Sequence, residues 1–214
     1  MEISERIDLL RKAVSLRLGE YRAKHVLSTE EEAVRIAKVY LPDKITKVRI
    51  SALLHDITKE YDVKKQLQIL SDFDIIVDNV TLNSPKVFHA MTAALIIPEE
   101  FQEFSDDDII SAVRNHTTGS ENMTLLDMII YLADYIEPLR KFDDCKKLRE
   151  YFWNGVHEND DKNTRLLHLY KTMVLSFDFT IKNLLEEKCV IAPDTFAARN
   201  AFVLKCMSVS EVSK

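Results

Sequence analysis

The sequence predicts an all-α protein, and three observations favour this fold class. Glycine and proline are scarce, with 3 and 5 in 214 residues, which is typical of helices joined by few tight turns. Apolar residues recur at every third or fourth position along most of the chain, as on one face of a helix. No segment shows the alternation of a convincing strand. We expect one helical domain over residues 1–214, with a core at about 20–140 and a C-terminal helical extension at about 141–205.

Three helices are predicted in the N-terminal part of the chain. The first carries a stripe of apolar residues at helical spacing, namely Ile3, Ile7, Leu10, Val14 and Leu18. Gly19 follows this stripe and can end the helix. The second helix covers about 21–41 and stops at Pro42, and the third runs from about 43 to 56.

The next part of the chain is less regular. We expect a short helix over about 63–70, followed by a loose segment rich in aspartate and asparagine. Helical spacing returns over about 85–97. Pro85 suits the first turn of that helix, and the polar Ser84 suits its N-cap.

Acidic residues at 106–108 favour the start of the following helix, because carboxylates stabilise the positive end of the helix dipole. This helix runs to about His116, and Thr-Thr-Gly-Ser at 117–120 breaks it. Another helix covers about 125–137 and is closed by Pro138. Three further helices are expected in the C-terminal extension, at about 143–152, 162–187 and 193–204.

Composition excludes several classes of partner. The net charge is -6 and no block of like charge resembles a nucleic-acid arm, so we expect no nucleic-acid polymer as partner. No apolar run approaches the ~20 residues that span a bilayer, so we expect no membrane association. Cys145, Cys189 and Cys206 are odd in number and have no paired spacing, which indicates reduced thiols in a cytoplasmic protein.

Imidazole and carboxylate side chains recur beside the apolar helical stripes. They are the groups that together hold borderline and hard divalent metals. The candidate ligands are His25, His55, Asp56, His89, His116 and Asp134. A single histidine at a helix end is more often a capping or core residue, and Asp56 can cap the segment after it. The recurrence of these groups in similar positions favours a metal site assembled from several helices.

Asp134 strengthens this interpretation. It lies within the apolar segment Ile-Ile-Tyr-Leu-Ala-Asp-Tyr-Ile, where an unpaired carboxylate would be costly to bury. A metal ion is a natural partner for an acid in such surroundings.

Several short motifs, taken in order, carry a resemblance to a known family. They are Arg22-Ala-Lys-His25, Leu53-Leu-His-Asp-Ile-Thr-Lys59, Arg114-Asn-His-Thr-Thr-Gly119, Tyr131-Leu-Ala-Asp-Tyr-Ile-Glu-Pro138 with Arg140, and Pro193-Asp-Thr with Ala-Arg-Asn200. Together they resemble the bacterial symmetrical diadenosine tetraphosphate hydrolases of the HD-domain metal-dependent phosphohydrolases. The His-Asp pair alone is a weak motif, whereas His-Thr-Thr-Gly followed by Ala-Asp-Tyr-Ile-Glu-Pro is highly specific. The chain departs from the pattern at Phe88, where a leucine is expected, and in an acidic, irregular segment over 71–83.

The resemblance implies an HD-domain helical bundle with a dinuclear metal site. One metal would be held by His25, His55, Asp56 and Asp134. The other would be held by His89, His116 and Asp56, whose two oxygens can bridge two cations. The implied cofactor is two divalent or trivalent ions, iron by resemblance, although such a donor set also accepts manganese, cobalt or nickel.

The resemblance also implies a nucleotide substrate that is hydrolysed by a metal-activated water. Asp56, Lys59 and Asp134 are the expected catalytic residues. Substrate contacts are expected from His25, Lys59, His89, Thr117, Thr118, Gly119 and Arg140. Among these, Lys59 and Arg140 would bind phosphate, with Arg140 as a two-pronged grip, and residues 117–119 would offer hydroxyls and free backbone N–H groups.

Other interpretations stay open at this point. Lys59 and Arg140 can be ordinary surface cations, and 117–119 can be a helix-ending turn in which Gly119 supplies a positive φ. Arg22 either packs near His25 or is solvated. The substrate can instead be a deoxynucleotide, a guanosine alarmone or a cyclic dinucleotide. A nucleotide-binding module without turnover and di-metal redox chemistry are further alternatives, and a homodimer is one possible oligomeric state.

Overall fold

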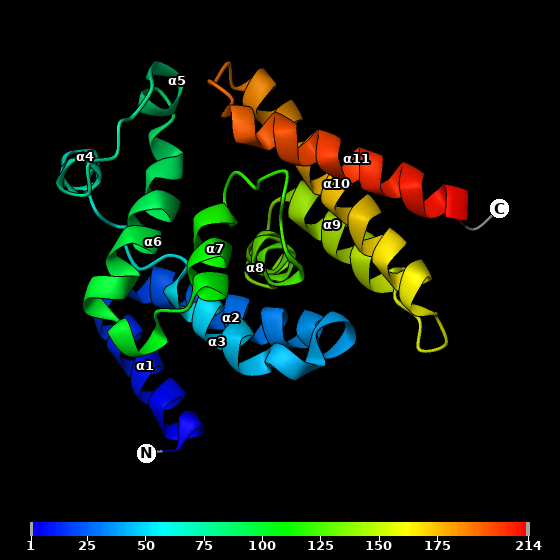
Figure 1. The fold of residues 1–214 in the computed structure, drawn as a ribbon, viewed down its shortest axis with the longest axis horizontal. Coiled ribbons are helices and arrows are strands. Elements are labelled where there is room, and N and C mark those ends of the chain that lie inside the picture. The colour runs from blue at the N-terminus through cyan, green and yellow to red at the C-terminus, as the bar shows by residue number, and fades with distance from the viewer. Residues whose placement is uncertain (1, 213–214) are drawn as a thin grey trace.

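The structure is a computed structural model that describes residues 2–212, and it is helical throughout (Figure 1). Eleven α-helices lie within these residues: α1 (Ile3–Arg17), α2 (Glu20–Tyr40), α3 (Ile45–Leu54), α4 (Val63–Asp72), α5 (Asn79–Leu82), α6 (Phe88–Glu100), α7 (Asp107–Asn115), α8 (Leu125–Ile136), α9 (Asp143–Asn154), α10 (Lys162–Glu186) and α11 (Pro193–Val212). Three short 3₁₀ helices join them: η1 (Pro42–Lys44), η2 (Pro85–Val87) and η3 (Gln102–Phe104). Residues 2–212 contain no strand, which confirms the all-α class.

Polar residues that precede the helices explain where several of them begin. Asp62 and Asp161 accept backbone N–H bonds at the starts of α4 and α10. Thr124 and Asp127 form a reciprocal capping box at the start of α8, where each side chain accepts a backbone N–H of the other. These caps fix the ends of α8 and α10, which line the cavity described below.

The structure differs from the sequence expectations in the segment before α6. Asp78 caps a short helix, α5, within the stretch expected to be loose. Ser84 does not cap the following helix, because its hydroxyl donates instead to the carbonyl of Val80 in α5. Pro85 begins η2 rather than an α-helix, so α6 starts only at Phe88. At the other end of the chain, α11 continues beyond residue 204 to Val212.

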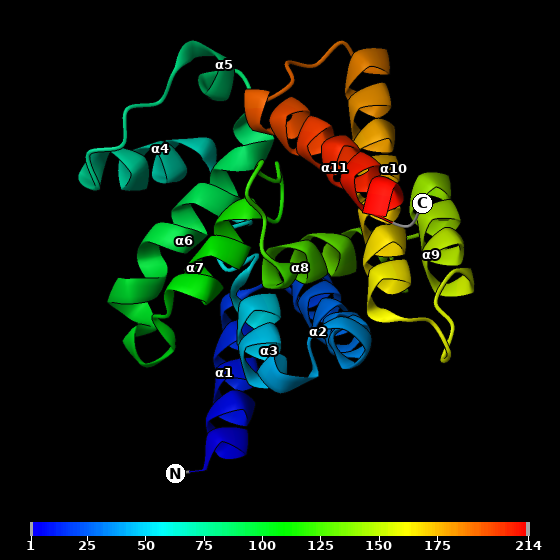
Figure 2. The same ribbon diagram turned by 45° about the vertical axis from the view of Figure 1, so that its right-hand side comes forward.

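Two buried clusters form the core, and α8 belongs to the larger one. The smaller cluster joins α1 and the start of α2 to α3, α6 and α7. The larger joins the rest of α2 and α3 to α8 and to the extension helices α9, α10 and α11. In Figure 1, α8 is seen end-on near the centre, with α6 and α7 on one side and α9–α11 on the other. Figure 2 shows α11 crossing over α10, against which it packs.

A tight turn between α7 and α8 packs against two helices of the extension. Gly119 has a φ of 68°, in the left-handed region that glycine adopts without steric cost. A Cβ at this position would lie 2.6 Å from Cζ of Phe177 in α10 and 3.0 Å from Cβ of Ala198 in α11. Only a glycine therefore fits where this turn meets the extension.

Among residues 2–212, no helix combines the length and the apolar character that crossing a bilayer requires.

Candidate metal centre

The six candidate ligands lie at or near helix ends that converge. His25 stands in the first part of α2, and His89 is the second residue of α6. His55 and Asp56 directly follow α3, His116 directly follows α7, and Asp134 lies in the last turn of α8. The five imidazole and carboxylate residues other than Asp134 are almost fully buried. Five different helix ends thus deliver all of the predicted ligands to one place.

Helix-end geometry orients two of the imidazoles. Nδ1 of His55 lies 2.6 Å from the carbonyl oxygen of Ala52, and Nδ1 of His116 lies 2.6 Å from that of Val113. Each ring thus donates its Nδ1–H to a carbonyl three residues earlier, one that the ending helix leaves free. The Nε2 lone pair is then directed away from the helix, which is the arrangement of a metal-ligating histidine.

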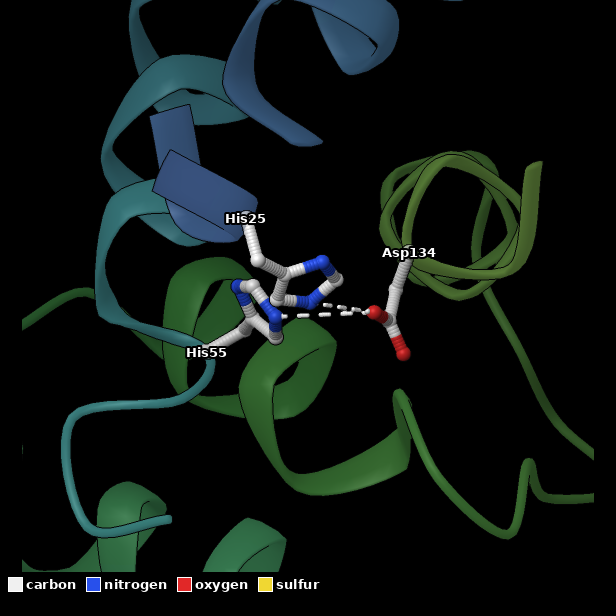
Figure 3. A group of neighbouring side chains, drawn as sticks. All are labelled: His25, His55 and Asp134. Carbon is white, nitrogen blue, oxygen red and sulfur yellow. Dashed lines mark ion pairs between the residues drawn. The ribbon is translucent and has the colours of Figure 1, made fainter. Parts of the chain in front are cut away.

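Asp134 faces two imidazoles on one side of the cluster (Figure 3). Its Oδ1 lies 2.9 Å from Nε2 of His25 and 3.8 Å from Nε2 of His55. Ligand atoms of these three residues lie within 4.8 Å of one another, close enough to share one cation.

Asp56 lies between the two halves of the cluster. Its Oδ2 is 3.6 Å from Nε2 of His25 and 3.5 Å from Nε2 of His55. Its Oδ1 is 3.3 Å from Nε2 of His89 and 3.7 Å from Nε2 of His116. The two carboxylate oxygens therefore face different pairs of imidazoles, which is the geometry that a bridging carboxylate needs.

The donor atoms fit a bound cation. Nε2 of His55 is buried without a hydrogen-bond partner among residues 2–212, and Nε2 of His25 makes no aligned hydrogen bond either, although Asp134 is close. Buried polar atoms are almost always bonded, so such atoms beside carboxylates indicate a missing partner. A metal ion satisfies both the nitrogen lone pairs and the carboxylates.

Electrostatics favour the ligating protonation states. Burial alone would raise the pKa of Asp56, but His55, His116 and His89 hold it well below its usual value. Burial likewise opposes ionisation of Asp134, and Arg140 and His25 more than offset it and lower the pKa of that carboxyl. Burial lowers the pKa of His89 and His116. Ionised carboxylates thus face neutral imidazoles at His89 and His116, as metal binding requires. At His25 burial would lower the pKa, but the carboxylates of Asp134 and Glu137 outweigh it and raise the pKa to about 9, so a metal ion that binds there would displace a proton.

Two further residues, Glu137 and Arg22, form hydrogen bonds with the candidate ligands. Oε1 of Glu137 lies 3.1 Å from Nδ1 of His25, and Glu137 is itself buried with its Oε2 accepting the Leu139 N–H at 2.6 Å. Nη1 of Arg22 donates to Oδ2 of Asp56 at 2.7 Å. Of the two alternatives for Arg22, a position near His25 therefore fits better than a solvated one, because Arg22 bonds the carboxylate of Asp56 beside His25. Glu137 was not singled out from the sequence, although it lies three residues after Asp134 in the same motif.

Asp134 is less isolated than its apolar sequence context predicts. Its side chain is 17% exposed, and Arg140 bonds it twice, from Nη2 to Oδ1 at 2.5 Å and from Nε to the backbone oxygen at 2.7 Å. The sequence predicts that a carboxylate in this apolar segment needs a partner, and Arg140 is one such partner in the structure. Arg140 makes these two bonds because it follows Asp134 across the helix end, and its expected contact with phosphate stays a prediction.

The turn at 117–119 uses most of its polar groups internally. The Gly119 N–H donates to the carbonyl of Asn115 at 2.9 Å, and the hydroxyl of the buried Thr118 donates to the Gly119 carbonyl at 3.1 Å. The expectation of free donors at these two residues is wrong, and the alternative of a helix-ending turn with positive φ at Gly119 holds. Only Thr117 of the three lines a cavity, with its Oγ1 3.1 Å from Nε2 of His89.

A cavity of about 600 Å³ opens beside the ligands. Asp56, His89, His116 and Asp134 line it at the metal end, whereas His25 does not reach it. Three cations also line it, namely Lys59, Lys86 and Arg140, and Nζ of Lys59 lies 3.2 Å from both ring nitrogens of His89. The remaining wall comes from α8 and the extension: Tyr131, Tyr135, Phe142, Asp143, Asp144, Cys145, Thr180, Asn183 and Glu187. Tyr131 and Tyr135 belong to the motif that holds Asp134, whereas the sequence motifs gave no sign of the wall residues from the extension.

Known proteins resemble this chain over most of its length. The protein of Halalkalibacterium halodurans named "Bis(5'-nucleosyl)-tetraphosphatase, symmetrical" is 33% identical over 188 residues, which cover 88% of this chain and 92% of that protein. The Bacillus subtilis protein of the same name is 31% identical over 190 residues, or 89% and 94%.

The fold has a solved counterpart. A crystal structure described as a predicted HD superfamily hydrolase involved in NAD metabolism, from Clostridium acetobutylicum, superposes with a TM-score of 0.80 at 30% identity and covers 92% of this chain and 97% of that one. Residues 22–139 match the family model described as HD domain, and this range holds all six candidate ligands. The chain therefore belongs to the HD-domain family.

Proposed function

We propose that this protein is a metal-dependent phosphohydrolase that cleaves diadenosine tetraphosphate symmetrically into two molecules of ADP. The observation that carries the proposal is the position of Asp56, which turns its two oxygens toward two pairs of imidazoles at one end of a cavity lined by cations. Relatives that span most of the chain bear the name of this activity.

Two metal ions are part of the proposal. His25, His55, Asp56 and Asp134 would hold one, and His89, His116 and Asp56 would hold the other. We propose iron, with manganese, cobalt or nickel as ions that the same nitrogen and oxygen donors accept. When bound, such ions supply positive charge to phosphoryl oxygens and lower the pKa of a water so that it can attack phosphorus.

The chain's own residues would bind and orient the substrate. Lys59 and Lys86 present ammonium groups to the cavity, where they can balance phosphate charge. Arg140 holds Asp134 in place through two bonds and adds positive charge to the same wall. Thr117 offers a hydroxyl beside His89. His25 would act as a ligand only, because it does not line the cavity.

We further propose a cytoplasmic location, consistent with the absence of disulfide bonds between the cysteines in the described chain.

Product analysis tests this function. Purified protein is stripped with a chelator, reloaded separately with iron, manganese, cobalt or nickel, and incubated with diadenosine tetraphosphate before the nucleotides are separated. We expect ADP as the single product, two per substrate. AMP with ATP would indicate asymmetric cleavage and contradict the proposal. Binding without turnover under every metal would favour a nucleotide-binding module, and turnover confined to a deoxynucleotide, an alarmone or a cyclic dinucleotide would favour another HD substrate.

Elemental analysis of protein purified without added metal tests the metal assignment. We expect close to two iron atoms per chain. Another transition metal at the same ratio would replace iron in the proposal but keep the dinuclear site. A single metal per chain would contradict that site.

A further inference from the structure

We propose that the C-terminal extension builds a purine subsite on its wall of the cavity, where the base stacks on Phe142 and its exocyclic amine bonds to the Asn183–Asp144 pair. This inference rests on the proposed nucleotide substrate. It assigns a recognition role to residues that lie after the part of the chain matched by the HD family model, which ends at residue 139.

Phe142 is an exposed aromatic side chain at a concave site. It is the N-cap residue of α9, is 73% exposed and lines the cavity. It belongs to neither of the two hydrophobic clusters among the described residues, so core packing does not explain it. A flat apolar ring that is open to a polar cavity offers a face on which any nucleobase can stack.

Asn183 and Asp144 provide hydrogen-bond acceptors in the same cavity as this ring. Nδ2 of Asn183, on α10, donates to Oδ2 of Asp144 at 3.0 Å, and Asp144 lies two residues after Phe142. This bond fixes the orientation of the amide, because its NH₂ must face the carboxylate. Oδ1 of Asn183 and Oδ1 of Asp144 make no hydrogen bond within residues 2–212.

The acceptors select a particular feature of the base. Adenine carries an amine at C6 and guanine carries one at C2, and either amine can donate to such oxygens. Hypoxanthine has no exocyclic amine and presents only a carbonyl at C6. A carbonyl opposed to the oxygens of Asp144 and Asn183 would leave all of them unpaired, which is unfavourable. The subsite therefore favours amino-purines over hypoxanthine.

The path from the metal ligands to this subsite is continuous. Tyr135 follows Asp134 on α8, and Thr180, Asp144 and Arg140 lie near its phenol group. Arg140 in turn bonds Asp134. Both ends line the same cavity of about 600 Å³, a volume in the range of sites that hold one drug-sized ligand. One nucleoside diphosphate half of the substrate fits between them.

Nucleotide binding by the manganese-loaded holoenzyme tests the subsite. Calorimetric dissociation constants are measured for ADP, inosine diphosphate and inorganic diphosphate. We expect ADP to bind the unmodified protein ~5- to 150-fold more tightly than inosine diphosphate. Phe142→Ala should weaken both nucleotides by ~5- to 150-fold and leave inorganic diphosphate unchanged. Asn183→Leu, which keeps the side-chain size but removes the acceptor, should bring the ADP to inosine diphosphate ratio toward one.

Two control variants keep the result interpretable. Phe142→Tyr keeps the stacking face and should bind ADP like the unmodified protein. Phe196→Ala removes a 44% exposed aromatic ring that does not line the cavity and should change nothing. Equal weakening of ADP and inorganic diphosphate, unchanged ADP binding by Phe142→Ala, or an unmodified protein that binds both nucleotides alike would overturn the subsite.

The same samples separate this inference from the proposed function. If the unmodified protein shows the expected binding ratios but releases no ADP from diadenosine tetraphosphate, the function fails and the subsite stands. If it releases ADP while both variants bind like the unmodified protein, the function stands and the subsite fails.

Discussion

The two ends of the cavity are built in different ways. At the end with the candidate ligands the side chains are mostly buried, and second groups contact them: backbone carbonyls for His55 and His116, Glu137 for His25, Arg22 for Asp56 and Arg140 for Asp134. At the far end Phe142 is mostly exposed, and Asn183 is held by one bond to Asp144. If the proposed roles hold, the difference implies that the core positions the metal ligands firmly, whereas the extension contacts the substrate through less constrained side chains.

Substitution of Asp56 tests the rigid end and has the largest expected effect. Asp56→Ala should remove both metals and reduce hydrolysis below detection, because its two oxygens face both groups of imidazoles. Elemental analysis and product assays measure this. Asp178→Ala, which removes an ion pair with Arg199 in the extension, should leave metal content unchanged. An Asp56→Ala protein that retains two metals would contradict the bridging role.

A substitution of Gly119 tests the contact between the turn after α7 and the extension helices α10 and α11. Gly119→Ala should lower the free energy of unfolding by ~3 kcal/mol, because alanine is strained at a φ of 68° and its Cβ would overlap Phe177 of α10. Urea unfolding at neutral pH measures the change.

Ser120→Ala is the matched control for this contact, since it alters the next residue of the same segment. We expect its effect to stay within about 0.5 kcal/mol. A Gly119→Ala protein as stable as the control would show that the extension can shift to accept the added methyl group, and that the contact with α10 is loose.

The sequence predicted the rigid end much better than the far end. Helical spacing and end signals located most helices, and the motifs placed His25, His55, Asp56, His89, His116 and Asp134 in one cluster, as the structure does. This succeeded because metal ligation needs particular side chains in a recognisable order. Ser84 failed as a cap because a neighbouring helix, α5, competed for its hydroxyl.

The sequence contains no comparable motif for the cavity wall that the extension forms. Phe142, Asp144 and Asn183 are ordinary residues of amphipathic helices in the sequence, and only the packing of α10 beside α9 brings them to one wall. Arg140 was correctly placed near the site, but its bonds to Asp134 depend on how the chain turns after α8. Pairwise geometry of this kind is set by tertiary packing rather than by local pattern.

Glu137 offers a way to weaken the rigid end without removing a ligand. Glu137→Ala should weaken binding of the metal held by His25 by ~10- to 100-fold, since groups that orient ligating histidines have effects of this size. Glu137→Gln keeps an acceptor for the Nδ1–H and should lose less. Metal affinity is measured by competition with a chelator of known affinity.

The comparison between the two metals serves as the internal control for Glu137. The ion held by His89 and His116 should keep its affinity, because Glu137 contacts His25 on the other side of the cluster. Equal loss of both ions in Glu137→Ala would indicate a general disturbance of the fold, and unchanged affinity of both would refute the positioning role.

Trp153 tests how firmly the extension is attached, with the smallest expected effect. Its Nε1–H donates to Oε1 of Glu32 at 2.6 Å and so joins α9 to the core helix α2, where Glu32 is 3% exposed. Trp153→Phe should lower the free energy of unfolding by ~1–2 kcal/mol, because it removes the close donor of this buried carboxylate and leaves only the longer ion pair with Arg35 at 3.7 Å. Metal content should not change. Tyr151→Phe, which keeps the ring contact with His168, should alter stability by less than about 0.5 kcal/mol.

The effect of Trp153→Phe should depend on pH. Burial raises the pKa of Glu32, while the Trp153 N–H opposes that rise by stabilising the ionised form. Loss of the N–H therefore raises the pKa of Glu32 further in the folded state. A raised carboxyl pKa contributes stability below its unfolded value that is lost as pH rises through the folded value. The variant should accordingly be closest to the unmodified protein near pH 4.5 and most destabilised at neutral pH. Urea unfolding at both pH values measures this, and an equal deficit at the two pH values would show that Trp153 acts through packing alone.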